Sequence, residues 1–255
     1  MLPTRADLEE VLRQKHGLQS GWGPRLRARF GYYTPDDVYE ACVSRHVNSK
    51  TEWLDVGGGR DLFPGNETTV RLLAARCRRL VGVDPSENIL ENPYLHERVQ
   101  STIEEFRPET RFDLVTMRMV AEHLVSPRAA VESLARLLKP GGVAIVYTVN
   151  KWSIITALSW VTPFRVHQLV KGWLWRTEDR DTFEVAYRMN TRKDLKRVFE
   201  DAGFRETDFL YLDDCRTTVR WQLANRFELS VWKALHAIGL HYPETCLLGI
   251  YELQH

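Results

Sequence analysis

From residue 52 onward, apolar runs of strand length alternate with segments of helical periodicity, and this alternation limits the possible folds more than any other feature. Strands are predicted at Glu52–Val56, Leu80–Val83 and Phe112–Met117, with a helix expected after each of them. Consecutive parallel strands need a crossover connection, which a helix usually provides. We therefore expect an α/β fold in which helices cover both faces of a mostly parallel sheet.

Four further segments extend the predicted sheet to seven strands. The Val143–Val149 run is apolar throughout, as in a strand buried on both faces. The other three are Arg98–Ser101, Phe209–Leu212 and Cys246–Tyr251. Helices are predicted over residues 5–15, 35–46, 67–78, 127–138 and 192–202, with N-caps at Thr34, Ser126 and Thr191. Lys139-Pro-Gly-Gly142 is expected to end the fourth of these helices.

The length of 255 residues fits one large domain, so we expect residues 1–255 to form a single unit. Within it, residues 1–50 are expected to form an N-terminal helical cover and residues 51–150 the cofactor-binding core. Residues 151–190 are expected to form a helical lid. Residues 191–255 complete the sheet, with a helical insertion at 216–243.

Composition excludes several classes of protein. A net charge of +1 argues against a general nucleic-acid partner. The chain begins with acids before any apolar run and contains no long uncharged apolar stretch, so we expect neither a secretory signal nor a membrane span. Its four scattered cysteines indicate reduced, mostly buried thiols in a cytoplasmic protein. No His/Cys cluster has metal-ligand spacing, so no metal is expected.

The residues at the ends of the first two strands carry the strongest chemical signal. Ligands of a parallel sheet bind outside the carboxyl ends of its strands. Asp55 ends the first strand and is followed by Gly57, Gly58 and Gly59, which let a ligand approach the backbone. An acid here would repel a pyrophosphate but suits an ammonium group. Asp84 ends the second strand, where an acid holds ribose hydroxyls. S-adenosylmethionine has both groups and no phosphate.

A nicotinamide-dependent dehydrogenase is the first alternative, because it uses a similar glycine loop. Its fingerprint needs a third glycine three positions after the second. Counting from Gly57, that position is Leu62. The spacing therefore argues against a dinucleotide-binding enzyme.

Four motifs in order resemble those of class I S-adenosylmethionine-dependent methyltransferases of the small-molecule type, a group that includes quinone- and lipid-pathway enzymes. They are Asp55-Val-Gly-Gly-Gly59, Val81-Gly-Val-Asp84, Phe112-Asp-Leu-Val115 with Ala121-Glu-His-Leu124, and Leu138-Lys-Pro-Gly-Gly142. They cover about residues 50–150, and Asn190–Phe204 resembles the helix that follows. The resemblance implies a Rossmann-like sheet and methyl transfer. One departure is Asp61, which stands where the family usually has a third glycine.

The resemblance also assigns roles to particular residues. The cofactor is expected to contact Asp55, Gly57, Gly58, Gly59, Asp84, Thr102, Ile103 and Arg118. The acceptor side is expected to include Tyr32, Tyr33, Glu122 and Trp152. If the acceptor is a hydroxyl, His123 or His167 is the candidate general base, because the pKa of histidine lies near neutrality. A packed histidine that shapes the pocket is the alternative for His123.

Residues 151–176 contain four tryptophans and four Lys or Arg residues but no acid. We expect them to cover a small, partly apolar acceptor, with a lipid-like molecule as one option; contact with a membrane surface and ordinary core packing are the alternatives. Two other functions stay open. The basic run Arg25, Arg27 and Arg29 would suit an RNA-modifying methyltransferase, and intact cofactor motifs would also suit a non-catalytic S-adenosylmethionine-binding partner protein. The acceptor, the methylated atom and the oligomeric state are not fixed by the sequence.

Overall fold

The computed structural model describes residues 1–17, 22–153, 185–216, 218–240 and 244–254. Its centre is a seven-stranded sheet with the order β3-β2-β1-β4-β5-β7-β6. The strands are β1 Glu52–Val56, β2 Arg79–Asp84, β3 Glu97–Gln100, β4 Phe112–Arg118, β5 Leu138–Val149, β6 Phe204–Asp213 and β7 Glu244–Leu253. All seven predicted strands are confirmed, several of them longer than predicted.

β1 to β5 pair in parallel, whereas β7 is antiparallel to both of its neighbours, β5 and β6. Because β5 and β6 both run opposite to β7, β6 runs in the same direction as the parallel strands. The carboxyl ends of β1, β2, β4, β5 and β6 therefore lie at one edge of the sheet. This edge is called the carboxyl edge below.

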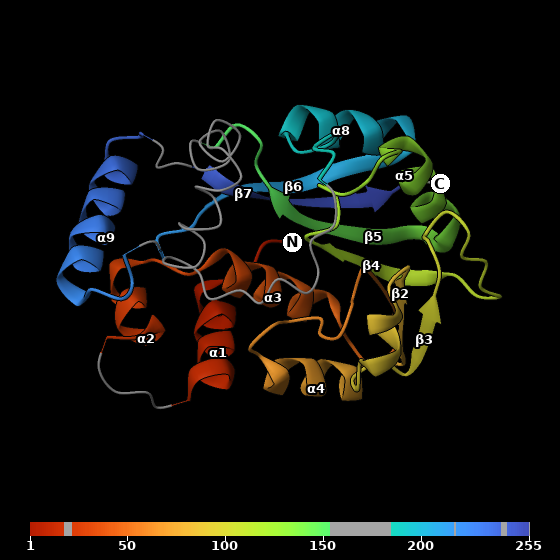
Figure 1. The fold of residues 1–255 in the computed structure, drawn as a ribbon, viewed down its shortest axis with the longest axis horizontal. Helices are drawn as coiled ribbons and strands as arrows, with labels where there is room; N and C mark the ends of the chain where they lie inside the picture. Colours follow the sequence, from red (N-terminus) through yellow and green to blue (C-terminus); the bar gives the residue numbers. More distant parts are fainter. Residues whose placement is uncertain (18–21, 154–184, 217, 241–243, 255) are drawn as a thin grey trace.

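The helices occupy two faces of the sheet (Figure 1). They are α1 Arg5–His16, α2 Pro24–Arg27, η1 Ala28–Phe30, α3 Pro35–His46, α4 Glu67–Arg76, η2 Glu87–Glu91, α5 Pro127–Leu137, α8 Arg192–Asp201 and α9 Gln222–Ala237. Thr34 and Thr191 cap α3 and α8 as predicted, each accepting a hydrogen bond from the backbone N–H three residues on. Ser126 stands at the N-cap of α5 but makes no side-chain capping bond.

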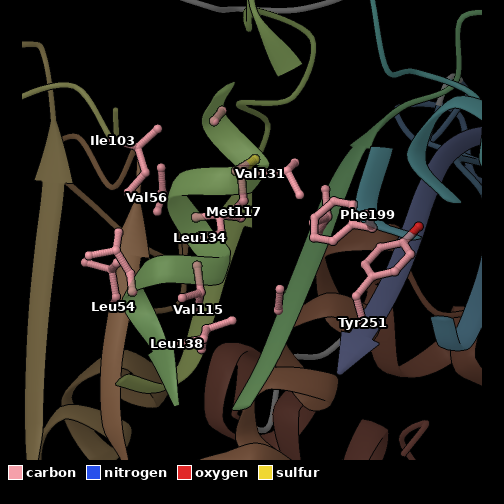
Figure 2. Packing of buried hydrophobic residues seen from close by; sticks show 14 of the residues in the cluster. Leu54, Val56, Ile103, Val115, Met117, Val131, Leu134, Leu138, Phe199 and Tyr251 are labelled. Atoms are coloured by element: carbon pink, nitrogen blue, oxygen red, sulfur yellow. The ribbon is translucent and has the colours of Figure 1, made fainter. Parts of the chain in front are cut away.

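Each face of the sheet has its own apolar core. On one face, Val131 and Leu134 of α5 and Phe199 of α8 pack against the sheet, and Phe199 stacks on Tyr251 of β7 with ring centroids 4.0 Å apart (Figure 2). On the other face, α3 and α4 pack against the sheet, with Tyr39 stacked on Tyr147 of β5. The sheet is thus buried on both faces, as the apolar strands predict.

The start of β5 differs from the prediction. β5 begins at Leu138, directly after α5, and includes Lys139-Pro-Gly-Gly142, which was expected to be a helix-ending loop. Leu138 pairs with Phe112 of β4, and the register then shifts before Val143 pairs with Leu114. Lys139 forms an ion pair with Asp113 of β4 at 2.8 Å. The pairing with β4 thus skips residues 139–142, and Gly141 has φ +76°, so a bulge lies where the turn signal was found.

The two predicted helical insertions have different outcomes. The insertion at 216–243 contains α9, so its helical character is confirmed. The expected lid at 151–190 lies mainly in residues 154–184, outside the described residues. All four cysteines are buried and unbridged, as predicted.

Candidate active site

Two glycines of the loop after β1, Gly57 and Gly58, lie too close to their surroundings to carry a side chain. Gly57 has φ +74°, and a Cβ atom on it would overlap the Val120 side chain. A Cβ atom on Gly58 would overlap the carboxylate of Asp55. The Gly57 N–H donates to the Val83 carbonyl at 2.8 Å, which ties the loop to the end of β2. The loop therefore presents bare backbone at the carboxyl edge.

Asp61 closes this loop in place of the family's third glycine. Its N–H donates to the Gly58 carbonyl at 3.1 Å, and its carboxylate accepts from the Phe63 N–H at 3.2 Å. Burial raises the pKa of Asp61. An acid is suited to this position because it satisfies a backbone donor of the turn.

Asp84 lies beside the glycine loop. One of its carboxylate oxygens accepts from the Gly59 N–H at 3.1 Å, and the other accepts from the Ser86 N–H at 2.7 Å. On the same loop, the Asn92 amide donates to the carbonyls of Gly58 and Gly59. The ends of β1 and β2 are thus held together by side chains, with the Asp84 carboxylate between them.

Asp55 lies buried beneath the loop. The Thr116 hydroxyl of β4 donates to its carboxylate at 2.5 Å and itself accepts from the Trp53 indole N–H at 2.7 Å. Burial raises the pKa of Asp55 to about 7, outweighing the Thr116 hydrogen bond and the positive charge of Arg118. Asp55 is therefore a carboxyl that can change its charge near neutral pH.

Arg118, at the end of β4, belongs to a chain of ion pairs. It contacts Asp36 at 2.7 Å, Asp36 contacts Arg216 at 3.0 Å, and Arg216 contacts Asp214 at 2.6 Å. Burial alone would raise the pKa of Asp36, but the two arginines outweigh it and hold the pKa below its usual value. This chain joins the start of α3, the end of β4 and the segment after β6 at the carboxyl edge.

Glu122 is buried in the loop after β4. Its carboxylate accepts from the Thr148 hydroxyl at 2.8 Å, and the Asn190 amide donates to the same hydroxyl at 2.8 Å. Burial raises the pKa of Glu122. Its neighbour His123 is half-buried, close enough for the two side chains to interact electrostatically. His167, the other candidate base, lies outside the described residues.

The two predicted tyrosines point to different surroundings. The Tyr32 hydroxyl accepts from the Cys215 N–H at 2.9 Å, and its buried ring packs edge-to-face on Trp232. Tyr33 is half-buried beside Arg5 and Glu9 of α1. The N-terminal cover therefore brings only Tyr32 toward the segment that follows β6.

The other predicted site residues lie around the same edge. Ile103 is buried next to Val56, at the end of β1 (Figure 2). The Thr102 carbonyl accepts from the N–H groups of Glu105 and Phe106, which forms the turn after β3. Trp152 follows β5 and is 75% exposed, with the Lys151 ammonium over its ring.

Three residues that complete this arrangement were not predicted from the sequence. Thr116 could have been found, because it is a polar residue inside an apolar strand and so needs a buried partner. Asp36 has no distinctive sequence signal, because an acid in the first turn of a helix is common, whereas here it also binds Arg118 and Arg216. Asn92 lies in a loop with no periodic pattern that would mark it.

A model of the family described as a methyltransferase domain matches residues 25–207 of this chain, more than half of its length. The chain belongs to this family. It is a class I S-adenosylmethionine-dependent methyltransferase with the Rossmann-like fold that the motifs predict.

Among curated relatives, the ubiquinone biosynthesis O-methyltransferase of Rickettsia felis is 28% identical over 207 residues, which cover 76% of this methyltransferase and 77% of the relative. The corresponding protein of Bradyrhizobium sp. is 37% identical over 126 residues, covering 44% and 47% of the two chains. The ubiquinone/menaquinone biosynthesis C-methyltransferase of Shewanella pealeana is 31% identical over 113 residues, covering 42% and 44%.

Solved structures share the fold at low sequence identity. The N-methyltransferase NodS of Bradyrhizobium japonicum, in complex with S-adenosylhomocysteine, has a TM-score of 0.50 at 15% identity and covers 98% of each chain. A Haloferax volcanii protein described as a putative methyltransferase, in complex with the activator Trm112, has a TM-score of 0.54 at 15% identity, covering 91% of this methyltransferase and 95% of that chain.

Two further features of the methyltransferase concern ligands and membranes. Among the residues that the structure describes, no three His, Cys, Asp or Glu side chains gather as metal ligands. No helix in the same part of the chain is long and apolar enough to cross a bilayer. The expectation that no metal is required stays a prediction.

Proposed function

We propose that this methyltransferase methylates an oxygen of a small, partly apolar acceptor. The observation that carries the proposal is the pair of exposed apolar side chains at the carboxyl edge. Val125, in the loop after β4, is 67% exposed, and Trp152, just after β5, is 75% exposed. Large apolar side chains left open around a binding site favour an apolar ligand, because covering them removes apolar surface from water.

The relatives support oxygen as the methylated atom. The relatives from three Rickettsia species that align over about three quarters of this chain are O-methyltransferases, whereas the Shewanella pealeana C-methyltransferase aligns over less than half of it. An acceptor oxygen must lose a proton during methylation, so a nearby base is useful. His123 follows β4 at the carboxyl edge, and we assign it that role.

The residues present fit the expected cofactor. Asp55 is a buried carboxyl whose charge is disfavoured, and an ammonium group beside it would favour the ionised form. No protein atom lies within 4 Å of the position that a Cβ atom on Gly59 would take, so the loop leaves open space beside Asp84 that a side chain would fill. Asp84 carries two carboxylate oxygens that can accept from ribose hydroxyls. When bound, S-adenosylmethionine supplies a methyl group made electrophilic by its sulfonium.

The chain itself then has three tasks. Asp55, the glycine loop and Asp84 hold the cofactor in one orientation, which sets the direction of an in-line displacement. The apolar side chains Val125 and Trp152 hold the acceptor and exclude water from the reacting atoms. His123 accepts the proton of the acceptor hydroxyl. The ion pairs of Arg118 and Asp36 fix the position of α3 beside the site.

The test compares two catechols, one with and one without an alkyl chain, as acceptors for the purified protein. We expect the alkylated catechol to be methylated with the higher kcat/KM and the product to be a methyl ether by mass spectrometry and NMR. A carbon-methylated product, or equal turnover of the two catechols, would contradict the proposal. Cofactor binding without any methylated product would instead favour a non-catalytic binding protein.

A His123→Asn variant tests the assigned base. We expect kcat to fall by about 100-fold or more, while the affinity for S-adenosylhomocysteine is retained. An unchanged kcat would assign His123 a packing role.

A further inference from the structure

Helix α9 lies next to the carboxyl edge. It is inserted between β6 and β7, and β6 ends at the same edge as β1, β2, β4 and β5. Figure 1 shows α9 at one end of the long axis of the molecule, with α2 as its neighbour. A partner that binds the surface of α9 would therefore lie near the end of the molecule that carries the candidate active site.

The inward face of α9 is fixed by polar contacts. The Asn225 side chain accepts from the Trp22 indole N–H at 3.1 Å and donates to the Cys215 carbonyl and to Glu228, both at 2.8 Å. Two turns after Asn225, the Trp232 indole N–H donates to Asp213 at 2.7 Å. Because these hydrogen bonds are directional and mostly buried, they fix which side of α9 faces the rest of the molecule.

This rotation turns a row of apolar side chains outward. Leu223 is 79% exposed, Phe227 is 72% exposed, and Val231 lies next along the same row. The four-residue spacing places them on one helix face, and Ile238, two turns after Val231, is 70% exposed. We call these four side chains the α9 apolar face. A helix of a water-soluble protein normally turns its apolar face inward, so this face is suited to an apolar partner.

The charges around the α9 apolar face are basic. Residues 218–240, which follow the paired Arg216, contain three Lys or Arg residues and one acid. That acid, Glu228, is buried and hydrogen-bonded to Thr218 and Asn225, so its charge does not reach the outer surface. Arg226 and Lys233 are exposed on α9 itself. At helical spacing both cations lie on the same side of the apolar row, and the Arg226 guanidinium also lies over the Trp22 ring. An apolar row with exposed cations beside it is typical of helices that lie in the interface of an anionic membrane.

We propose that the α9 apolar face binds the surface of an anionic lipid bilayer, with Arg226 and Lys233 contacting lipid phosphates. A second copy of this chain fits the face less well, because a two-fold axis through α9 would bring these cations close to their own counterparts. The proposal goes beyond the methylation reaction and does not depend on the acceptor. It would place the carboxyl edge near the membrane interface, where apolar acceptors accumulate.

The test is cosedimentation of the full chain with vesicles. One set contains phosphatidylglycerol and phosphatidylcholine, and the other contains phosphatidylcholine alone. We expect binding to the anionic vesicles, weaker binding to the neutral ones, and a decrease with added salt. The variant Leu223→Ser/Phe227→Ser/Ile238→Ser should reduce the partition coefficient by about tenfold or more. The variant Arg226→Gln/Lys233→Gln should reduce it and weaken its salt dependence.

A matched control removes exposed apolar side chains elsewhere. Leu72 of α4 and Leu90 of η2 are 46% and 55% exposed, and the variant Leu72→Ser/Leu90→Ser should bind vesicles like the unchanged protein. Unchanged affinity of the α9 variant for S-adenosylhomocysteine would show that it folds. The proposal fails if the unchanged protein does not bind anionic vesicles, or if the α9 variant binds them equally well. A dimer that the α9 variant converts to monomers, without vesicle binding, would identify the face as a contact between copies.

Discussion

The Thr116 hydroxyl donates a hydrogen bond of 2.5 Å to the buried carboxylate of Asp55. This bond joins the middle of β4 to the residue that precedes the glycine loop of β1. It favours the ionised carboxyl, but burial dominates, and the pKa of Asp55 is about 7 in the cofactor-free protein. The charge that a bound ammonium group would meet therefore depends on the balance between burial on one side and the Thr116 hydroxyl and Arg118 on the other.

The first prediction concerns pH. The ionised form of Asp55 is the form expected to bind an ammonium group, so affinity for S-adenosylhomocysteine should rise as the pH increases through about 7. Calorimetric titrations at about pH 6 and about pH 8, on either side of the Asp55 pKa, measure this affinity. Asp55→Asn should bind weakly at every pH. A pH-independent affinity in the unchanged protein would separate Asp55 from cofactor binding.

The raised pKa of Asp55 affects folding stability in the opposite direction: as the pH rises, affinity for the cofactor increases but folding stability decreases. A carboxyl with a raised pKa in the folded state binds more protons there than in the unfolded chain, so its contribution to stability is present at acid pH and is lost as the pH rises through about 7. Glu40 has a similarly raised pKa from burial and contributes in the same direction. Cofactor should therefore raise Tm more at pH 8 than at pH 6.

The second prediction tests the Thr116 hydroxyl directly. Thr116→Val keeps the shape of the side chain but removes the donor, so the pKa of Asp55 should rise further. The midpoint of the pH dependence of S-adenosylhomocysteine affinity should then move to higher pH, and affinity at pH 7 should fall. The variant should regain affinity at pH 8 or above. A uniform loss of affinity at all pH values would indicate a packing defect instead.

The third prediction concerns Asp84, which is expected to hold the ribose hydroxyls. Asp84→Asn retains an acceptor for the Gly59 N–H but loses the charge, so affinity for S-adenosylhomocysteine should fall by roughly 2–4 kcal/mol. Calorimetry at pH 8 gives the value. Glu87→Gln, an exposed change three residues away, is the control and should bind normally. Equal affinities for the two variants would refute the assignment of Asp84.

The fourth prediction separates backbone strain from lack of space in the glycine loop. Gly57 and Gly65 have φ values of +74° and +77°, but only a Cβ atom on Gly57 would overlap a neighbour, the Val120 side chain. Gly65→Ala should cost about 1–2 kcal/mol of folding stability from backbone conformation alone. Gly57→Ala should cost more and also abolish cofactor binding. Denaturant unfolding compares the two, and equal costs would contradict the close approach of Val120.

The fifth prediction concerns the ion pairs of Asp36. Asp36→Asn removes the partner of both Arg118 and Arg216, which are partly exposed, so the free energy of unfolding should fall by about 1–3 kcal/mol at pH 7. The pKa of Asp36 is lowered in the folded protein, so this contribution should be lost as the pH falls below about 4. Glu132→Gln, in an exposed pair with Arg128, is the control and should change stability little.

The strand and helix pattern of this chain could be predicted because it is local. Burial on both faces makes Val143–Val149 apolar throughout, and the N-caps of α3 and α8 need only Thr34 and Thr191 with the three residues that follow. At residues 139–142, β5 begins earlier than predicted, but its pairing with β4 shifts register there and Gly141 keeps a left-handed conformation. Asp55 and Asp84 could be found because they stand near the carboxyl ends of adjacent parallel strands, where Asp55 is in register with Gly82.

The amino-acid sequence by itself thus determined the order of the elements, the glycine loop and the two acids that flank it. Only the tertiary structure decided which side chains meet. Asp36 pairs with Arg118 and Arg216, which are 82 and 180 residues away, and Asn225 of α9 meets Trp22, 203 residues away. It also decided that α9 turns its polar side inward. Hydrophobic periodicity indicates which face of a segment is buried. These pairings depend instead on how distant segments pack together, because charges and hydrogen bonds act over a few ångströms in space and not along the chain.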